Sequence, residues 1–256
     1  MSFFSVVQIS DCHIGASGWH RDPVAGLEAA VRRTQALLGG PPDAVLVTGD
    51  IAHGGSAEHY ELAHSALSEL EAPLFALPGN HDEREALAAR FAIPATGRTD
   101  LSYAAELGPL RLVALDTQDP GQEGGRIDEP RMQWLASTLA QAPDTPTLLA
   151  MHHPPLRTGV PPMDRASIPR GECEAFERIV AAHPQVALIA TGHVHRVIAA
   201  TVGRAALLAI TSTADQLALD FTFGEFQRVA EPACIALHLL LDGRLVSHVA
   251  PVEAIG

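Results

Sequence analysis

Short runs of apolar residues alternate along the chain with stretches in which apolar residues recur at helical spacing. The run at residues 3–9 is nearly continuous, which is typical of a buried strand. Further strands are predicted at residues 44–48, 74–77, 111–115, 147–151, 186–190 and 205–210, and in a strand-rich C-terminal region, about 231–250, at 233–241 and 245–249. Helices are predicted at residues 24–38, from Ser56 to about 70, and at 83–91, 129–139 and 173–182. Strands that alternate with helices predict a layered α/β fold.

Residues with special backbone preferences mark the ends of these elements. Pro23 falls in the first turn of the first helix, and Gly39 follows its last turn. Ser56 is a typical cap for the second helix. No linker rich in Pro, Gly and Ser divides the chain, so residues 1–256 are predicted to form a single domain. The Pro- and Gly-rich segment 159–170 is predicted to be a long loop, and such loops are often functional.

Composition and charge narrow the class of protein. The chain has 256 residues, 47% of them hydrophobic, and no apolar run that reaches the ~18 residues of a membrane span. With 17 Lys and Arg against 30 Asp and Glu, the net charge is −13, which disfavours binding to nucleic acid polymers or anionic membranes. The N-terminus lacks the basic and apolar pattern of a signal peptide. Three scattered cysteines form no disulfide framework, so we expect a cytoplasmic location.

Side chains that bind metals follow five of the predicted strands. These residues are Asp11 and His13, Asp50, Asn80 with His81 and Asp82, His152 with His153, and His193 with His195. In open α/β sheets, ligands bind outside the carboxyl ends of the strands. We therefore expect the five clusters to meet at one edge of the sheet. Each motif alone is a weak indication, because a solvated turn explains it equally well, but the ordered set is specific.

The set contains enough ligands for two metal ions. Asp11, His13, Asp50 and His195 could hold one ion, and Asp50, Asn80, His152 and His193 a second, with Asp50 as the bridge. Oxygen and imidazole ligands without a thiolate suit Mn, Fe or Zn, as a divalent or mixed-valence pair. Two such ions reverse the local charge of an acidic chain, so an anionic phosphate can bind, and a pair of ions can promote phosphoryl displacement.

The order of these motifs resembles the calcineurin-like metallophosphoesterase superfamily, whose pattern is D-x-H, GD, GNH[DE], H and GHxH. The segments GDIAHGG, LPGNHDERE, LDTQDPG, MHHPPLRTG and ATGHVHR resemble its class III cyclic nucleotide phosphodiesterase and glycerophosphodiesterase group. The resemblance covers roughly residues 5–220. It implies a four-layer αββα sandwich of two mixed sheets, a dinuclear centre with the ligands named above, and homodimers or larger assemblies. His53, where the group commonly has an acidic residue, and Asp215, where it has a histidine, depart from the pattern.

Several residues near the motifs have two readings. His81 resembles the residue that meets the leaving group, and the alternative is a structural hydrogen-bond partner. Arg84 could contact a phosphate or form a salt bridge on the short helix. Cys12 and His153 are expected to pack beside the ligands. Met163 and Asp164 could wall the pocket or contact a second subunit.

The prediction from these features is a phosphodiesterase that hydrolyses small phosphodiesters, such as 3′,5′-cyclic nucleotides like cAMP, or glycerophosphodiesters. The resemblance implies attack by a metal-bridging hydroxide, with Asp50 and His81 as catalytic residues and Asn80, His81 and Arg84 as substrate contacts. A phosphomonoesterase or nucleotide pyrophosphatase of the same fold is the alternative among enzymes. A catalytically silent binding subunit is the alternative outside enzymes.

Overall fold

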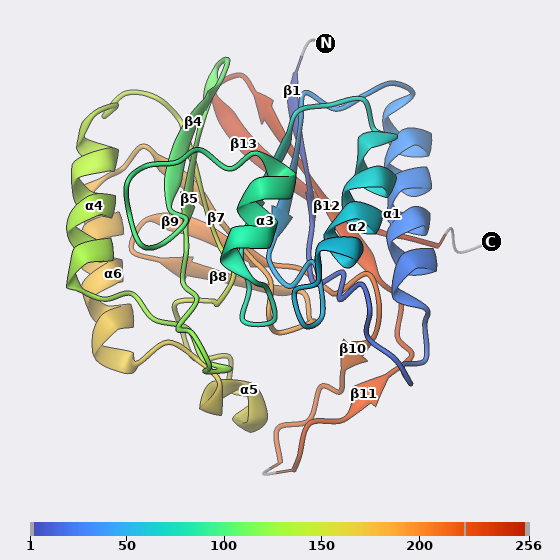
Figure 1. The fold of residues 1–256 in the computed structure, drawn as a ribbon. Coiled ribbons are helices and arrows are strands. Elements are labelled where there is room, and N and C mark those ends of the chain that lie inside the picture. Colours follow the sequence, from blue (N-terminus) through green and yellow to red (C-terminus); the bar gives the residue numbers. More distant parts are fainter. Residues whose placement is uncertain (1–2, 223, 254–256) are drawn as a thin grey trace.

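The computed structural model describes residues 3–222 and 224–253, which form two large β-sheets and a two-stranded hairpin (Figure 1). The strands of the first sheet, in spatial order, are β13 (Arg244–Pro251), β12 (Cys234–Leu241), β1 (Phe4–Ile9), β2 (Ala44–Thr48) and β3 (Leu74–Leu77). Those of the second are β4 (Tyr103–Leu107), β5 (Leu110–Leu115), β6 (Thr147–Met151), β7 (Val186–Thr191), β9 (Ala205–Ala209) and β8 (Ile198–Val202). Both sheets mix parallel and antiparallel pairs.

Helices cover the outer faces of the two sheets (Figure 1). Those on the first sheet are α1 (Pro23–Leu38), α2 (Ala57–Ser68) and α3 (Arg84–Phe91), and those on the second are α4 (Glu129–Ala140) and α6 (Arg170–Ala182). One apolar cluster lies under each helical layer, and a third, which includes Leu46 and Leu148, lies between the sheets. The predicted four-layer αββα sandwich is confirmed.

Local sequence explains why these elements begin and end where they do. The side chain of Asp22 accepts a hydrogen bond from the Ala25 N–H and caps α1, and Pro23 occupies the first turn. Gly39 ends the helix in the left-handed conformation that glycine adopts at low cost. β2 and β6 are buried at every residue, as expected for central strands with covered faces.

The structure adds elements that the hydrophobic pattern did not predict. β4 and β8 form the two edges of the second sheet, where half-buried positions weaken the apolar pattern. The segment predicted as a long loop at 159–170 contains the short helix α5 (Pro161–Arg165). Near the C-terminus, β10 (Gln216–Leu217) and β11 (Arg228–Val229) pair as a small hairpin that extends below the sheets in Figure 1.

The carboxyl ends of five strands converge, but they belong to two sheets. β1, β2 and β3 contribute from the first sheet, and β6 and β7 from the second, so the expectation of one edge of one sheet was wrong. The sheets are joined there by hydrogen bonds: Gln8 Nε2 donates to the Thr191 carbonyl at 3.0 Å, and His152 Nδ1 lies 2.8 Å from the Thr48 carbonyl. Across the described ranges, no helix combines the length and apolar character needed to span a membrane.

Candidate metal centre and active site

The candidate ligands lie on strained backbone at the strand ends. Among the described residues, eight non-glycine residues have positive φ angles. Five of the eight are Asp11, His13, Asp50, His193 and His195, with φ between 48° and 68°. A side chain in this left-handed region costs about 1–2 kcal/mol, and such strain concentrates at functional sites. The sharp turns direct these side chains into one buried space.

Four ligand atoms lie close together around the end of β1. His13 Nε2 lies 3.1 Å from His195 Nε2 and 3.5 Å from Asp50 Oδ2. His195 Nε2 in turn lies 3.4 Å from Asp11 Oδ1. This is the first predicted set: Asp11, His13, Asp50 and His195.

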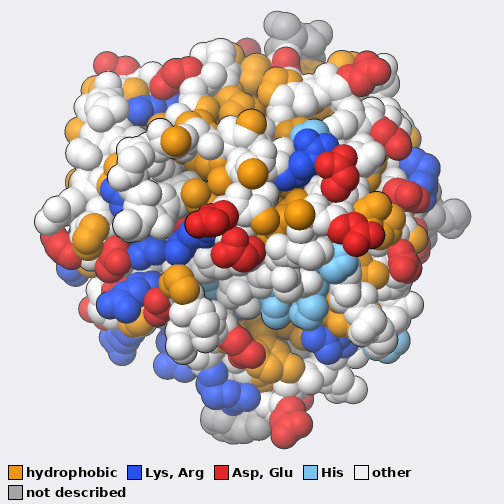
Figure 2. All heavy atoms as spheres, viewed as in Figure 1, with side chains coloured by type: hydrophobic (Ala, Val, Ile, Leu, Met, Phe, Trp, Pro, Cys, Tyr) orange, Lys and Arg blue, Asp and Glu red, His pale blue; other side chains and the backbone are white. Residues whose placement is uncertain are grey.

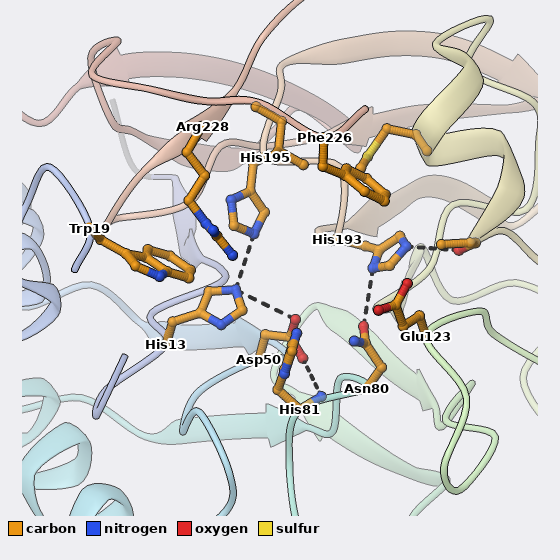
Figure 3. A pocket seen from close by; sticks show the side chains of 13 residues that line it. His13, Trp19, Asp50, Asn80, His81, Glu123, His193, His195, Phe226 and Arg228 are labelled. Atoms are coloured by element: carbon orange, nitrogen blue, oxygen red, sulfur yellow. Dashed lines mark hydrogen bonds and ion pairs between the residues drawn. The ribbon is translucent and has the colours of Figure 1, made fainter. Parts of the chain in front are cut away.

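A second set adjoins the first through Asp50. His152 Nε2 lies 3.4 Å from the same Asp50 Oδ2 and 3.2 Å from Asn80 Oδ1. Asn80 Oδ1 is also 3.1 Å from His193 Nδ1. Asp50 therefore stands between the two sets, where the sequence predicted a bridging ligand (Figure 3).

These separations fit metal coordination. Two ligand atoms about 2.1 Å from one ion, at angles of about 90–110°, are about 3.0–3.4 Å apart. Groups of His and Asp side chains with ligand atoms near one another include Asp11, His13 and His195, and Asp11, Asp50 and His152. A hydrogen bond between two imidazole nitrogens requires one of them to carry a proton, whereas a shared cation uses both lone pairs. The donor set therefore suits two ions that prefer nitrogen and oxygen.

Backbone carbonyls fix which nitrogen of each ring faces the centre. His152 Nδ1 lies 2.8 Å from the Thr48 carbonyl, His193 Nε2 lies 2.8 Å from that of Ala166, and His195 Nδ1 lies 2.7 Å from that of Asp215. A carbonyl only accepts, so each of these nitrogens donates. The opposite nitrogen of each of these three rings then faces the centre, where it can bind an ion through its lone pair once it carries no proton.

Burial and nearby charges lower the pKa of some imidazoles at the centre and raise that of others. Burial lowers the pKa of His13 to about 3 and that of His193 to about 4, so both rings are neutral at pH 7. For His152, burial opposes protonation, but the Asp50 carboxylate prevails and raises the pKa to about 9. Burial would raise the pKa of Asp50, yet His152 and His13 hold it well below its usual range. Ion binding would displace the His152 proton.

A cavity of about 190 Å³ opens beside the two sets. Its lining residues are His13, Trp19, Asp50, Asn80, His81, Glu123, Met163, Ala166, His193, His195, Leu217, Phe226 and Arg228. Figure 2 shows histidine side chains next to hydrophobic ones in the lower centre of this face. The cavity thus places apolar walls around a polar floor, which is typical of a site for a small molecule.

His81 reaches this cavity from the turn after β3. Its backbone N–H donates to Asp50 Oδ1 at 2.9 Å, which links it to the bridging carboxylate. Its ring stacks on that of His53, with centroids 4.6 Å apart, and lies 5.0 Å from the His13 ring. His81 therefore lies beside the candidate ligands and lines the cavity, the position that the predicted role near a leaving group requires.

Arg84 does not line the cavity. Its Nε donates to Asp116 Oδ2 at 2.7 Å, and its Nη2 donates to the Gln118 carbonyl at 2.9 Å. Asp116 is fully buried directly after β5, so the ion pair is anchored away from the centre. Of the two readings for Arg84, the structure shows the salt bridge, although its partner lies outside the short helix.

The other flanking residues support the centre or its walls. Cys12 is buried in the apolar cluster under α1–α3. His153 Nδ1 is 2.8 Å from Thr117 Oγ1, and its ring lies 4.4 Å from that of His193. Met163 lines the cavity, whereas Asp164 accepts hydrogen bonds from the Thr158 N–H and hydroxyl and shapes the loop before α5.

A known family pattern, described as calcineurin-like phosphoesterase, matches residues 4–197, more than half of the 256-residue chain. The chain belongs to the calcineurin-like phosphoesterase family. The resemblance drawn from the five motifs is thereby confirmed.

Similar proteins come from several bacteria and from a fish. A probable glycerophosphodiester phosphodiesterase of Arcobacter nitrofigilis is 32% identical, over 91% of this chain and 87% of that one. A 3′,5′-cyclic adenosine monophosphate phosphodiesterase of Pseudomonas aeruginosa is 31% identical, over 97% and 90%. A dimetal phosphatase from Danio rerio, 15% identical, superposes with a TM-score of 0.75 over 98% and 96% of the chains and shares the fold.

Sequence reasoning missed the four aromatic or charged cavity residues that lie outside the metal motifs of this calcineurin-like phosphoesterase. Trp19 lies in the loop after the first motif, Glu123 in the loop after β5, and Phe226 and Arg228 on the hairpin. None belongs to a metal motif, and Phe226 and Arg228 lie beyond the matched residues 4–197. The one available indication was an aromatic residue, Trp19, six positions after His13 in a glycine-containing segment.

Proposed function

We propose that this chain is a dinuclear metal-dependent phosphodiesterase acting on small diesters, either 3′,5′-cyclic nucleotides or glycerophosphodiesters. The observation that carries the proposal is Asp50 Oδ2, which lies 3.5 Å from His13 Nε2 and 3.4 Å from His152 Nε2 and so joins two ligand sets. The glycerophosphodiester and cyclic AMP phosphodiesterases that this chain resembles support the substrate class.

The proposed roles follow from the positions of the side chains. Asp11, His13, Asp50 and His195 would hold one ion, and Asp50, Asn80, His152 and His193 the other. Two bound ions supply positive charge to the phosphoryl oxygens and make water a nucleophile at neutral pH. His81, which lines the cavity, donates a proton to the leaving oxygen as its bond to phosphorus breaks, so that the product leaves as an alcohol. Asn80 directs its amide into the cavity and is a further substrate contact.

Metal identity, assembly and location are parts of the same proposal. Nitrogen and oxygen donors favour a Mn, Fe or Zn pair, and a homodimer or larger homo-oligomer would use the segment 159–170 or the C-terminal strands. The exposed edge of β13, with Val246 and Val249 partly exposed, supports strand pairing between copies. A cytoplasmic location is supported by three cysteines, Cys12, Cys173 and Cys234, all of which are free thiols.

The test combines metal content with turnover. Protein reconstituted with Mn, Fe or Zn should bind about two ions per chain and hydrolyse bis(p-nitrophenyl) phosphate. Addition of a chelator should abolish this activity. A substrate panel should show higher kcat/KM for cAMP or a glycerophosphodiester than for p-nitrophenyl phosphate. Preference for the monoester would support the phosphomonoesterase alternative, and two bound ions without turnover would support a silent binding subunit.

A further inference from the structure

The cavity contains one cationic side chain among the described residues, and it is Arg228. Arg84, the other candidate for phosphate binding, is committed to Asp116 at 2.7 Å. Arg228 is exposed on β11, and no described carboxylate lies within ion-pair distance of it. The chain has a net charge of −13, so a cationic side chain without a carboxylate partner is unexpected beside the candidate metal centre. Such a side chain is available to bind an anion.

Trp19 contacts the guanidinium of Arg228, and no described residue accepts a hydrogen bond from that guanidinium. The guanidinium carbon lies 4.5 Å from the centroid of the Trp19 ring, within the range of a cation–π interaction. Trp19 itself lies against His13, with ring centroids 4.7 Å apart. A guanidinium that meets an aromatic ring through its face keeps its N–H groups at the edge, where they can bind phosphate in bidentate fashion. In Figure 3, the Arg228 side chain points from the hairpin toward His13 and His195.

Asp215 assembles this arrangement from three separate segments. Its carboxylate accepts hydrogen bonds from the His20 N–H at 2.8 Å and the Arg21 N–H at 3.1 Å, which fixes the segment that carries Trp19. Its carbonyl accepts from His195 Nδ1 at 2.7 Å. It directly precedes β10, whose Leu217 pairs with Arg228. One residue thus couples a candidate metal ligand, the Trp19 loop and the hairpin.

We propose that Arg228, oriented by Trp19, donates hydrogen bonds to the phosphoryl group of the substrate and is the cationic substrate-binding residue of the site. The inference rests on the proposed function, because the phosphoryl group must bind beside His13 and His195. It assigns substrate recognition to a hairpin that lies outside the residues matching the family pattern, 4–197. Trp19 and Asp215 are positioning residues that act through Arg228.

The test measures substrate turnover and phosphate binding on metal-loaded protein. Arg228→Met should lower kcat/KM for bis(p-nitrophenyl) phosphate roughly 10–100-fold, the range for a lost charge-assisted hydrogen bond, and Arg228→Lys should retain part of it. Calorimetric titration with inorganic phosphate should show a matching loss of affinity, with metal content unchanged. Arg244→Met is the charge-matched control, because Arg244 lies beside Leu241 at the opposite end of the first sheet. Its kinetics and phosphate affinity should equal those of wild type.

A double-mutant cycle tests the part played by Trp19. Trp19→Leu should reproduce part of the Arg228→Met defect, and Trp19→Phe, which keeps an aromatic face, should restore activity. The Trp19→Leu and Arg228→Met losses should be less than additive, because both remove one contact. Phosphate affinity and kcat/KM that are unchanged in Arg228→Met would overturn the proposal. Wild-type protein that binds phosphate through Arg228 but turns over no diester would instead overturn the proposed function alone.

Discussion

Gln118 closes the turn that carries Asn80 and His81, since its Nε2 donates to the carbonyl oxygen of Asp82 at 2.7 Å. The same nitrogen lies 2.9 Å from the carbonyl oxygen of Gly79. Gln118 follows β5 in the second sheet, whereas the turn follows β3 in the first. One side-chain amide therefore ties the two halves of the sandwich together directly behind a candidate metal ligand.

We expect Gln118→Met to weaken both folding and metal binding. The substitution keeps the side-chain volume but removes the donor to the buried Asp82 carbonyl and one of two donors to the Gly79 carbonyl. This loss costs about 1–3 kcal/mol of unfolding free energy. A loosened turn should also reduce metal affinity about 10–100-fold, as for other residues that orient ligands. Chemical denaturation and metal titration measure the two effects.

Gln185→Met provides the matched control. Gln185 Nε2 donates to the Leu139 carbonyl at 2.9 Å, at the end of α4 and away from the centre. This variant should lose stability but keep wild-type metal affinity. Equal metal affinity in both variants would show that Gln118 contributes to folding stability but not to metal binding.

Removal of Asp50 should reduce the occupancy of both ions. Its Oδ2 faces His13 in one set and His152 in the other, so Asp50→Ala takes a ligand from each. Elemental analysis should give about two ions per wild-type chain and fewer than one per variant chain. Asp43→Ala is the control, because Asp43 precedes β2, where it binds Ser5 at the opposite end of the strand from Asp50. At most one ion in wild type at saturating metal would contradict the dinuclear centre.

The central strands could be predicted from sequence because burial on both faces gives an unbroken apolar run. The central strands β2 and β6 have the predicted bounds, and so does β3, a short apolar run at the edge of the first sheet. The edge strands β4 and β8 escaped prediction because only part of each is buried, and both contain alanines, which favour helices over strands. Paired strands of two residues each, as in β10 and β11, leave no periodic pattern at all.

The site could be predicted only where it depends on local motifs. Asp11, Asp50 and Asn80 follow strands directly, so the topology of the fold brings them together. Trp19 and Arg228 meet through tertiary contacts between segments from opposite ends of the chain, and a single sequence holds no trace of such a pairing. The ion pair of Arg84 could not be predicted either, because its partner Asp116 follows β5 in the second sheet.

Stability should fall as the pH drops below about 6.5, partly because of His238. Burial lowers the pKa of His238 to about 4 in the folded protein, where Nε2 contacts Gln8 Oε1 at 3.1 Å. The unfolded chain binds this proton near pH ~6.5, so it gains protons first as the pH falls. Above pH ~6.5, this pKa difference contributes roughly 3 kcal/mol to the free energy of unfolding. The contribution is lost progressively as the pH falls toward 4.

The measurement is the unfolding free energy of wild type and His238→Gln at pH 7.5 and pH 5. The variant should lose less stability over this interval, because glutamine does not titrate. His248→Gln, an exposed histidine on the neighbouring strand β13, controls for the removal of an imidazole. An identical loss in wild type and His238→Gln would mean that other groups cause the acid sensitivity.

His81→Ala should slow natural diesters far more than activated ones. His81 lines the cavity, and its backbone N–H donates to Asp50 at 2.9 Å, so the imidazole lies next to the place proposed for the phosphoryl group. Histidine is the side chain suited to proton transfer near neutral pH. An alkoxide leaving group needs that proton, whereas p-nitrophenolate is weakly basic and leaves without it. General acid catalysis contributes roughly 10²–10⁴-fold, and we expect the loss for cAMP or a glycerophosphodiester to fall in that range.

The decisive comparison is kcat/KM for both kinds of diester in wild type, His81→Ala and His53→Ala, with metal content measured in parallel. His53 stacks on His81 with centroids 4.6 Å apart, so its removal takes away a neighbouring imidazole without removing the proposed acid. His53→Ala should therefore change the two substrates by similar factors. Equal losses in His81→Ala would mean that His81 positions the substrate or stabilises charge, because neither role depends on the basicity of the leaving group. Loss of metal in His81→Ala would instead show that the His81 ring has a structural role at the metal centre, because the variant keeps the backbone N–H that donates to Asp50.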